Sequence, residues 1–103
     1  MEEKLLPIMK KMLRITWEDT DEDDNIKIMI RAGVQYLDSV AGQAIDYESD
    51  SVALDLLYFY VLYRRSDSLA AYRKEYSRNL LSLSLRYKAG REKKKKEAFE
   101  SEA

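Results

Sequence analysis

A run of carboxylates over residues 19–24 is the part of the chain most similar to a metal site. A calcium-binding loop of twelve residues needs glycine at its sixth position and a bidentate glutamate at its twelfth. Counted from Asp19 or from Asp21, the sixth residue is Asp24 or Ile26, and neither frame has glutamate at the twelfth. We therefore interpret these acids as the first turn of a helix, where negative charge meets the positive end of the helix dipole.

Few other residues suit catalysis. The chain has no histidine and no cysteine, which removes the commonest general base, thiolate metal ligands and disulfides. Asp55 is the one acid in strongly apolar surroundings, and we expect it to pair with Arg31, Arg64 or a tyrosine hydroxyl. No nucleophile–base arrangement or glycine-rich phosphate loop is present. We expect no enzymatic activity, no bound metal and no cofactor.

A basic run near the C-terminus is the second group of interest. The formal net charge of the chain is −1, so it is not a polycation. Contact with DNA or with an acidic partner would need this local patch, or several copies of the chain arranged in a ring. The candidate portal or DNA contact residues are Arg91, Lys93, Lys94, Lys95 and Lys96.

Tyrosine is abundant, with eight in 103 residues. Tyrosine rings fill cores, and tyrosine is also enriched at binding surfaces because it joins an apolar ring to a polar hydroxyl. Both interpretations stay open from the sequence. The candidate residues for a subunit interface are Tyr58, Tyr60, Tyr63, Tyr72 and Tyr76.

The elements that position these groups are expected to be helices, since the chain has one proline and three glycines. We predict an all-α fold, a small bundle of about four helices with two long antiparallel helices. Residues 1–90 are expected to form one domain, and residues 91–103 a flexible charged tail. The first residues lack the pattern of a signal peptide, so we expect the protein to be intracellular when it is made. The apolar run 52–63 is shorter than the ~20 residues of a membrane span, so we expect no membrane partner.

The helix over residues 21–41 is the best-defined element. Thr20 is the expected N-cap, and Gly42 the expected left-handed C-cap. Gly33 costs a helix about 1 kcal/mol relative to alanine, so its place on the apolar face predicts close approach by another helix. The apolar stripe of this helix follows spacings of four and three, at Ile26, Ile30, Gly33, Leu37 and Val40.

Two further helices flank this one. Pro7 suits the first turn of a helix ending near residue 14, although the residues before it could extend that helix. Trp17, in the link that follows, is expected to be a packing anchor. The apolar segment 52–63 predicts a helix capped by Ser49 or Asp50. A strand is the competing interpretation of that segment, because its residues also have high β-propensity.

A last helix is predicted over residues 69–88, capped by Ser66 or Ser68 and stopped by Gly90. Alternation of leucine and serine in residues 80–85 leaves a break there as an alternative. Beyond Gly90 the sequence is charged and is expected to be loose.

The order of these elements is similar to that of the bacteriophage head–tail connector (adaptor) family, small helical proteins associated with DNA packaging. The likeness covers most of residues 8–88. An aromatic third helix ending in Y-R-R also fits, although related chains often have tryptophan where this one has tyrosine. The segments that carry the resemblance are M-K-K-M-L-R-I-T (9–16), D-E-D-D (21–24), I-x-x-x-I-x-A-G-x-x-Y-L (26–37), Gly42 and L-x-L-R-Y (83–87).

The resemblance implies a structural protein without enzymatic activity. Its members form a homo-oligomeric ring, expected to be a dodecamer, at the head–tail junction of the virion, and a subunit alone can be monomeric. The ring docks on the portal protein, extends the DNA channel without sequence-specific binding, and receives a tail-side stopper or head-completion protein. The family's C-terminal region docks on the portal, which suggests a role for residues 91–96.

Two other functions stay open. A small helical DNA-binding regulator needs a recognition helix with basic residues on its outer face. Only residues 69–88 qualify, since they carry Arg73, Lys74, Arg78 and Arg86. A generic helical protein-interaction module is the other alternative, and it would need no nucleic acid.

Overall fold

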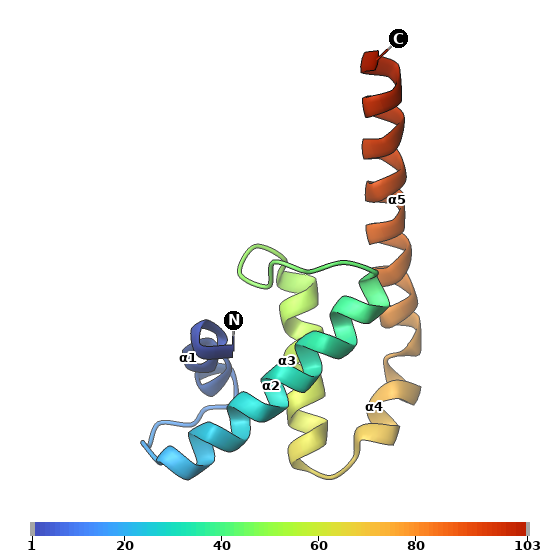
Figure 1. Ribbon diagram of the computed structural model, residues 1–103. Helices are drawn as coiled ribbons and strands as arrows, with labels where there is room; N and C mark the ends of the chain where they lie inside the picture. The colour runs from blue at the N-terminus through green and yellow to red at the C-terminus, as the bar shows by residue number, and fades with distance from the viewer. Residues whose placement is uncertain (1, 103) are drawn as a thin grey trace.

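The computed structural model describes residues 2–102, and the side chains of residues 2–95 among them (Figure 1). Every regular element in this part of the chain is helical, which confirms the all-α prediction. Five helices are present rather than about four, because the predicted last helix is divided at Tyr76. The helices are α1 (Glu2–Met12), α2 (Thr20–Ala41), α3 (Ser51–Arg65), α4 (Leu69–Glu75) and α5 (Ser77–Glu102).

Helix α2 is the centre of the fold. It packs against α1, α3 and α5, while α4 contacts both α3 and α5. Figure 1 shows α2 crossing α3 obliquely, so the predicted pair of long antiparallel helices is not confirmed. The C-terminal half of α5 projects beyond the other helices, and the molecule measures 57 × 28 × 17 Å along its principal axes.

Helix α2 begins one residue earlier than expected because Asp19, rather than Thr20, is its N-cap. The Asp19 carboxylate accepts hydrogen bonds from the backbone N–H groups of Asp21 at 3.0 Å and Glu22 at 3.3 Å. The predicted C-cap is confirmed, since Gly42 has φ of 76° and donates its N–H to the end of the helix. Left-handed backbone of this kind favours glycine.

The buried face of α2 follows the predicted stripe at Ile26, Ile30, Gly33 and Leu37. At its end the buried residue is Ala41, and the predicted Val40 is half-buried. A Cβ atom at Gly33 would lie 2.6 Å from Cδ1 of Leu57 and 2.8 Å from Cδ1 of Tyr60. The backbone of α2 therefore approaches α3 closely, which confirms the reason predicted for this glycine.

The N-terminal segment differs from its prediction in two ways. Pro7 lies in the interior of α1 and not in its first turn, because the residues before it are helical and bury Leu5 against the core. Trp17 is not a packing anchor, since its side chain is 53% exposed. Its Nε1 donates instead to Oε2 of Glu22 at 2.8 Å.

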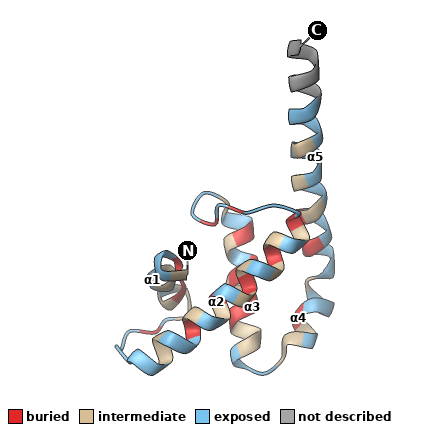
Figure 2. Ribbon diagram, in the orientation of Figure 1, coloured by how far each residue is buried: buried red, intermediate tan, exposed pale blue. Residues whose placement is uncertain are grey.

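The apolar segment forms a helix and not a strand. Asp50 is the N-cap of α3 and accepts a hydrogen bond from the N–H of Ala53 at 3.1 Å. Helix α3 packs against α2 and α4, and Figure 2 shows buried residues along α3 where α2 crosses it. The rest of the helix is apolar without being fully covered, since Leu54, Tyr58 and Leu62 are half-buried. Asp55 is exposed, so the predicted pairing of a buried charge is wrong.

The last third of the chain departs most from prediction. Ser68 occupies the N-cap position of α4, but its side chain makes no capping hydrogen bond. The leucine–serine alternation is helical, with Leu80 and Leu83 buried. Gly90 does not stop α5, which continues to Glu102, so residues 91–102 are not loose coil.

Candidate functional site

The tyrosines of α3 and α4 form one aromatic cluster. Tyr72 is fully buried, donates its hydroxyl to the carbonyl oxygen of Leu56 at 2.9 Å, and has a ring centroid 5.6 Å from that of Tyr60. Because Tyr60 and Tyr72 belong to the core, their prediction as interface residues is wrong. The other three candidates are half-buried and stay a prediction, namely Tyr58, Tyr63 and Tyr76.

A second cluster joins α5 to the start of α3, and Asp50 is its centre. Oδ2 of Asp50 accepts from the hydroxyl of Tyr87 at 2.6 Å and from Nη2 of Arg86 at 2.6 Å. Burial opposes the charged carboxylate, but the Tyr87 and Ala53 hydrogen bonds and the Arg86 charge outweigh it and lower the pKa of Asp50. Burial, followed by the bond to Asp50, raises the pKa of Tyr87 to about 12.

Arg91 makes the second attachment of α5 to the body. Its guanidinium donates to the carbonyl oxygen of Ala41 and, at 3.0 Å, to Oε1 of Gln43. A cation at the C-terminus of α2 also complements the dipole of that helix. A Cβ at Gly42 would lie 3.0 Å from Nη2 of Arg91, so this glycine also makes room for the guanidinium. Arg91 therefore has a structural role that its prediction as a contact residue did not include.

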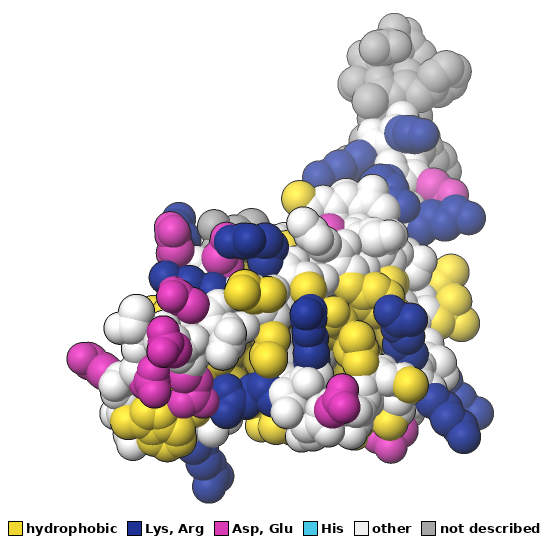
Figure 3. Space-filling view, turned by 60° about the horizontal axis from the view of Figure 1, so that its bottom comes forward, with side chains coloured by type: hydrophobic (Ala, Val, Ile, Leu, Met, Phe, Trp, Pro, Cys, Tyr) yellow, Lys and Arg dark blue, Asp and Glu magenta, His cyan; other side chains and the backbone are white. Residues whose placement is uncertain are grey.

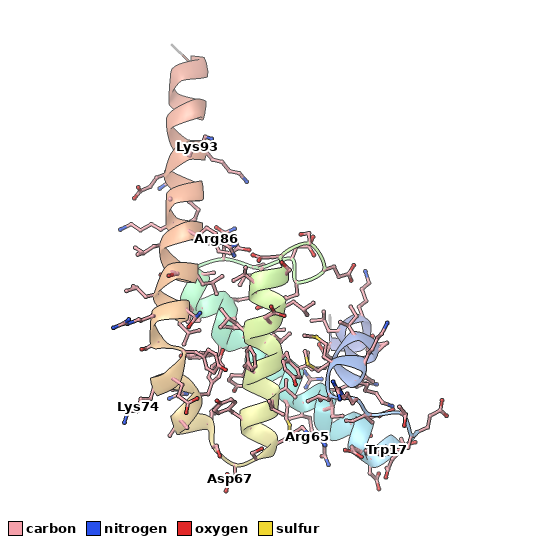
Figure 4. The ribbon with its side chains drawn as sticks, turned by 180° about the vertical axis from the view of Figure 1, so that it is seen from behind. Trp17, Arg65, Asp67, Lys74, Arg86 and Lys93 are labelled. Atoms are coloured by element: carbon pink, nitrogen blue, oxygen red, sulfur yellow. The ribbon has the colours of Figure 1, made fainter. Side chains whose placement is uncertain are left out.

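The lysines extend outward from this junction. Figure 4 shows Lys93 on the projecting part of α5, and Lys94 and Lys95 beside it are also exposed. The side chain of Lys96 lies outside the described residues. A hollow of about 270 Å³, the junction pocket, lies at the base of this projection. Its lining comes from α5 and from the connection between α2 and α3, through Gln43, Asp50, Arg86, Tyr87, Gly90, Arg91 and Lys94.

The acidic run lies at the opposite end of the molecule, where Figure 3 shows Asp and Glu side chains gathered away from the cations of α5. Several of these acids have partners within the chain. Glu22 accepts from Trp17 and, at 2.9 Å, from Arg65, and these hydrogen bonds lower the pKa of Glu22. Asp23 pairs with Lys10 at 2.8 Å. Within the described residues no group of three or more potential ligands is placed to hold a metal ion.

Exposed apolar side chains are scattered over the surface rather than concentrated on α3. Leu81 and Leu85 lie one turn apart on α5 and are 60% and 56% exposed. The apolar residues 52–63 pack against α2 and α4, and several of them stay half-buried. Among the side chains that the structure describes, the exposed large hydrophobic residues are Trp17, Ile28, Val52, Leu81 and Leu85.

Sequence reasoning missed the junction pocket because its residues come from two segments that are distant in the sequence, the connection between α2 and α3 and the middle of α5. Arg91 contacts a carbonyl 50 positions earlier in the chain. Gly90 was the available signal, since a glycine in a charged, helix-forming segment needs either a helix stop or another reason. We interpreted it as a stop, and the structure shows a continuous helix.

The fold and these surfaces define a small all-α protein with a projecting basic helix. Comparisons with protein-family models, with curated proteins and with solved structures find no match to this chain. Among the described residues, no helix combines the length and the apolar character needed to cross a membrane. Any function must therefore be argued from the chain's own residues.

Replacement Asp50→Asn tests the electrostatics of the junction. Asparagine also caps helices, so the change removes the charge while keeping the cap. We expect a loss of about 1 kcal/mol in unfolding free energy at pH 7. The pKa of Asp50 is lower in the folded state than in the unfolded state. Its charge therefore makes its whole contribution to the unfolding free energy above the unfolded pKa of about 3.9, and the contribution is lost as the pH falls through the folded pKa.

Urea unfolding at pH 7 and pH 3 measures this effect. The difference between the wild type and Asp50→Asn should shrink at pH 3. The control is Asp55→Asn, because Asp55 is an exposed acid on α3. We expect no change in the unfolding free energy of this variant. An equal loss for both variants would contradict the assignment.

Proposed function

We propose that this chain is a subunit of a bacteriophage head–tail connector ring. In this proposal the ring docks on a portal protein, lengthens the DNA channel and receives a tail-side stopper or head-completion protein. In this proposal the chain is a structural subunit and catalyses no reaction. The sequence resemblance over residues 8–88 is the origin of the proposal, and the described geometry supplies one feature that supports it.

That feature is the projecting, basic half of α5. Arg91 and the Asp50 cluster attach α5 to the body, so the lysines beyond them extend from a fixed base. A helix of n residues is about 1.5n Å long, which gives residues 91–102 a reach of about 18 Å. An arm of this kind suits docking of a ring subunit into a larger assembly. The exposed leucines Leu81 and Leu85 offer apolar surface for contact between subunits.

The DNA-binding regulator is the weaker proposal. Its candidate recognition helix is divided at Tyr76. Two of its four cations are engaged within the chain, since Arg73 lies over the ring of Tyr36 at 5.3 Å and Arg86 pairs with Asp50. Sequence-specific retardation of one duplex in a gel-shift assay would favour it. The generic interaction module is favoured if a non-portal protein is the sole partner captured.

Binding to the portal ring of the same phage tests the proposal. We expect the full chain to co-sediment with purified portal rings and to add a ring of density in electron micrographs. The double change Lys93→Glu/Lys95→Glu should weaken this binding about tenfold or more, because it reverses two exposed charges on the projecting helix.

The matched control is Lys11→Glu/Lys74→Glu, which makes the same change in net charge at two exposed lysines of α1 and α4. This variant should bind the portal as the wild type does. Absence of any portal binding by the wild type would refute the connector proposal. If both variants weaken portal binding equally, the role of the projecting lysines would be refuted and the connector proposal itself would not.

A further inference from the structure

Gly90 has no structural explanation among the residues that the structure describes. It lies inside helix α5, where glycine costs about 1 kcal/mol relative to alanine. Apart from its chain neighbours and the local backbone of α5, a Cβ atom added at Gly90 would meet no heavy atom within 4 Å, so neither packing nor a close helix contact requires its small size. Gly90 does line the junction pocket. A glycine at such a place lets a ligand approach the helix backbone.

The cations around Gly90 indicate what that ligand is. Arg86, Arg91 and Lys94 line the junction pocket with a single carboxylate, that of Asp50, so the local charge is positive. Each arginine has five N–H donors, and the internal bonds described above leave several of them available. Lys94 makes no ion pair with any described residue and adds three more donors.

The carboxylate of Asp50 does not compete for the whole set of cations. It already accepts from Tyr87, Arg86 and the N–H of Ala53, and its pKa is lowered, so it stays ionised and engaged at neutral pH. The three cations therefore exceed the fixed negative charge by two. A dianion would balance this excess.

We propose that the junction pocket binds a phosphate group. Guanidinium groups bind phosphate oxygens through two parallel N–H donors, and an ammonium adds a point charge. The volume of about 270 Å³ is below that of sites for drug-sized ligands, but it holds a phosphate with some water. The phosphate comes either from the DNA backbone or from a free phosphate ion. This inference does not depend on the connector proposal.

Titration of the full chain with inorganic phosphate tests the pocket. Backbone amide shifts in NMR spectra are followed at constant ionic strength, with chloride and acetate as the competing anions. We expect saturable shifts at residues 86–94 with an affinity on the order of 1 mM. Chloride and acetate should cause no saturable shift there. Phosphate shifts no larger than those of chloride, or acetate binding as tight as phosphate, would overturn the assignment.

Two adjacent lysines provide a matched pair of variants. Lys94 lines the junction pocket and Lys93 does not, although both are exposed and carry the same charge. We expect Lys94→Gln to weaken phosphate binding about fivefold and Lys93→Gln to leave it unchanged. Equal effects of the two variants would mean that phosphate senses only the general charge of the helix, and the pocket would be rejected.

Gly90→Leu removes the space without removing a charge. Leucine is a good helix former and would meet no atom of the chain at its Cβ, so the fold should be kept. Phosphate binding should be lost, and unchanged binding would contradict the proposal. Fluorescence anisotropy with a short DNA duplex then separates the two sources. Weaker DNA binding by Gly90→Leu identifies the DNA backbone, and unchanged DNA binding identifies the free ion.

Discussion

Replacement of Tyr72 by alanine is expected to reduce the free energy of unfolding by about 4 kcal/mol. The ring is fully buried and its centroid lies 5.3–6.5 Å from those of Tyr36, Tyr60, Tyr63 and Tyr76. Alanine would leave a cavity at the contact that holds α4 on α3. Since small domains have about 5–15 kcal/mol of stability in total, this variant should be close to unfolding at 37 °C.

The hydroxyl of Tyr72 is separable from its ring. Tyr72→Phe leaves the carbonyl of Leu56 without its side-chain donor and should cost about 1–2 kcal/mol. Burial, then the neighbouring tyrosines, raises the pKa of Tyr72. The neutral hydroxyl therefore makes its whole contribution to the free energy of unfolding below the unfolded pKa of about 10, and this contribution is lost as the pH rises above that value. Tyr72→Phe should reduce this alkaline loss of stability.

Urea unfolding monitored by circular dichroism measures both variants. Lys74→Ala, an exposed change on the same short helix, is the control and should stay within about 0.5 kcal/mol of the wild type. A loss below 1 kcal/mol for Tyr72→Ala would show that α4 is not held by this ring.

Replacement of Gly33 by valine is the second large effect, expected to cost about 3 kcal/mol. The added Cβ would lie within 3 Å of Leu57 and Tyr60, and both residues are buried with little room to move. The two methyl groups of valine would extend this overlap and force α2 away from α3. Gly33→Ala should cost less, because better helix propensity, worth up to about 1 kcal/mol, offsets part of the overlap.

Gly90→Ala is the matched control for this experiment. It makes the same gain in helix propensity, but outside the local backbone of α5 and the two chain neighbours no heavy atom lies within 4 Å of the added carbon. We expect no loss of stability for Gly90→Ala, as measured by thermal unfolding. Equal destabilisation at the two glycines would contradict the close α2–α3 approach.

The portions of the fold that sequence predicts well are those governed by neighbours along the chain. The acids of the first turn and Gly42 define α2 to within one residue, and Asp50 marks the start of α3. The apolar stripe from Ile26 to Leu37 gives the buried face correctly, because a helical repeat places these residues on one side.

Interactions between distant segments account for what was mispredicted. No residue near Tyr76 is a helix breaker, yet the chain bends there, where the Tyr76 ring stacks on Phe59 at 4.9 Å and contacts Tyr72. Two of the tyrosines expected at an interface, Tyr60 and Tyr72, are core residues because their rings pack against each other and against Tyr36 of α2.

The candidate site shows the same division. The sequence identifies Lys93–Lys96 as a local concentration of charge, since such a run is visible without a fold. It cannot show that Arg91 caps α2, or that Asp50 and Tyr87 meet, because 50 and 37 residues separate these partners. By itself, the sequence determined that the chain is helical, where α2 and α3 begin, and which stripe α2 buries. Helix capping and periodicity act within a few residues, whereas only tertiary packing brings the connection between α2 and α3 against the middle of α5 to form a pocket.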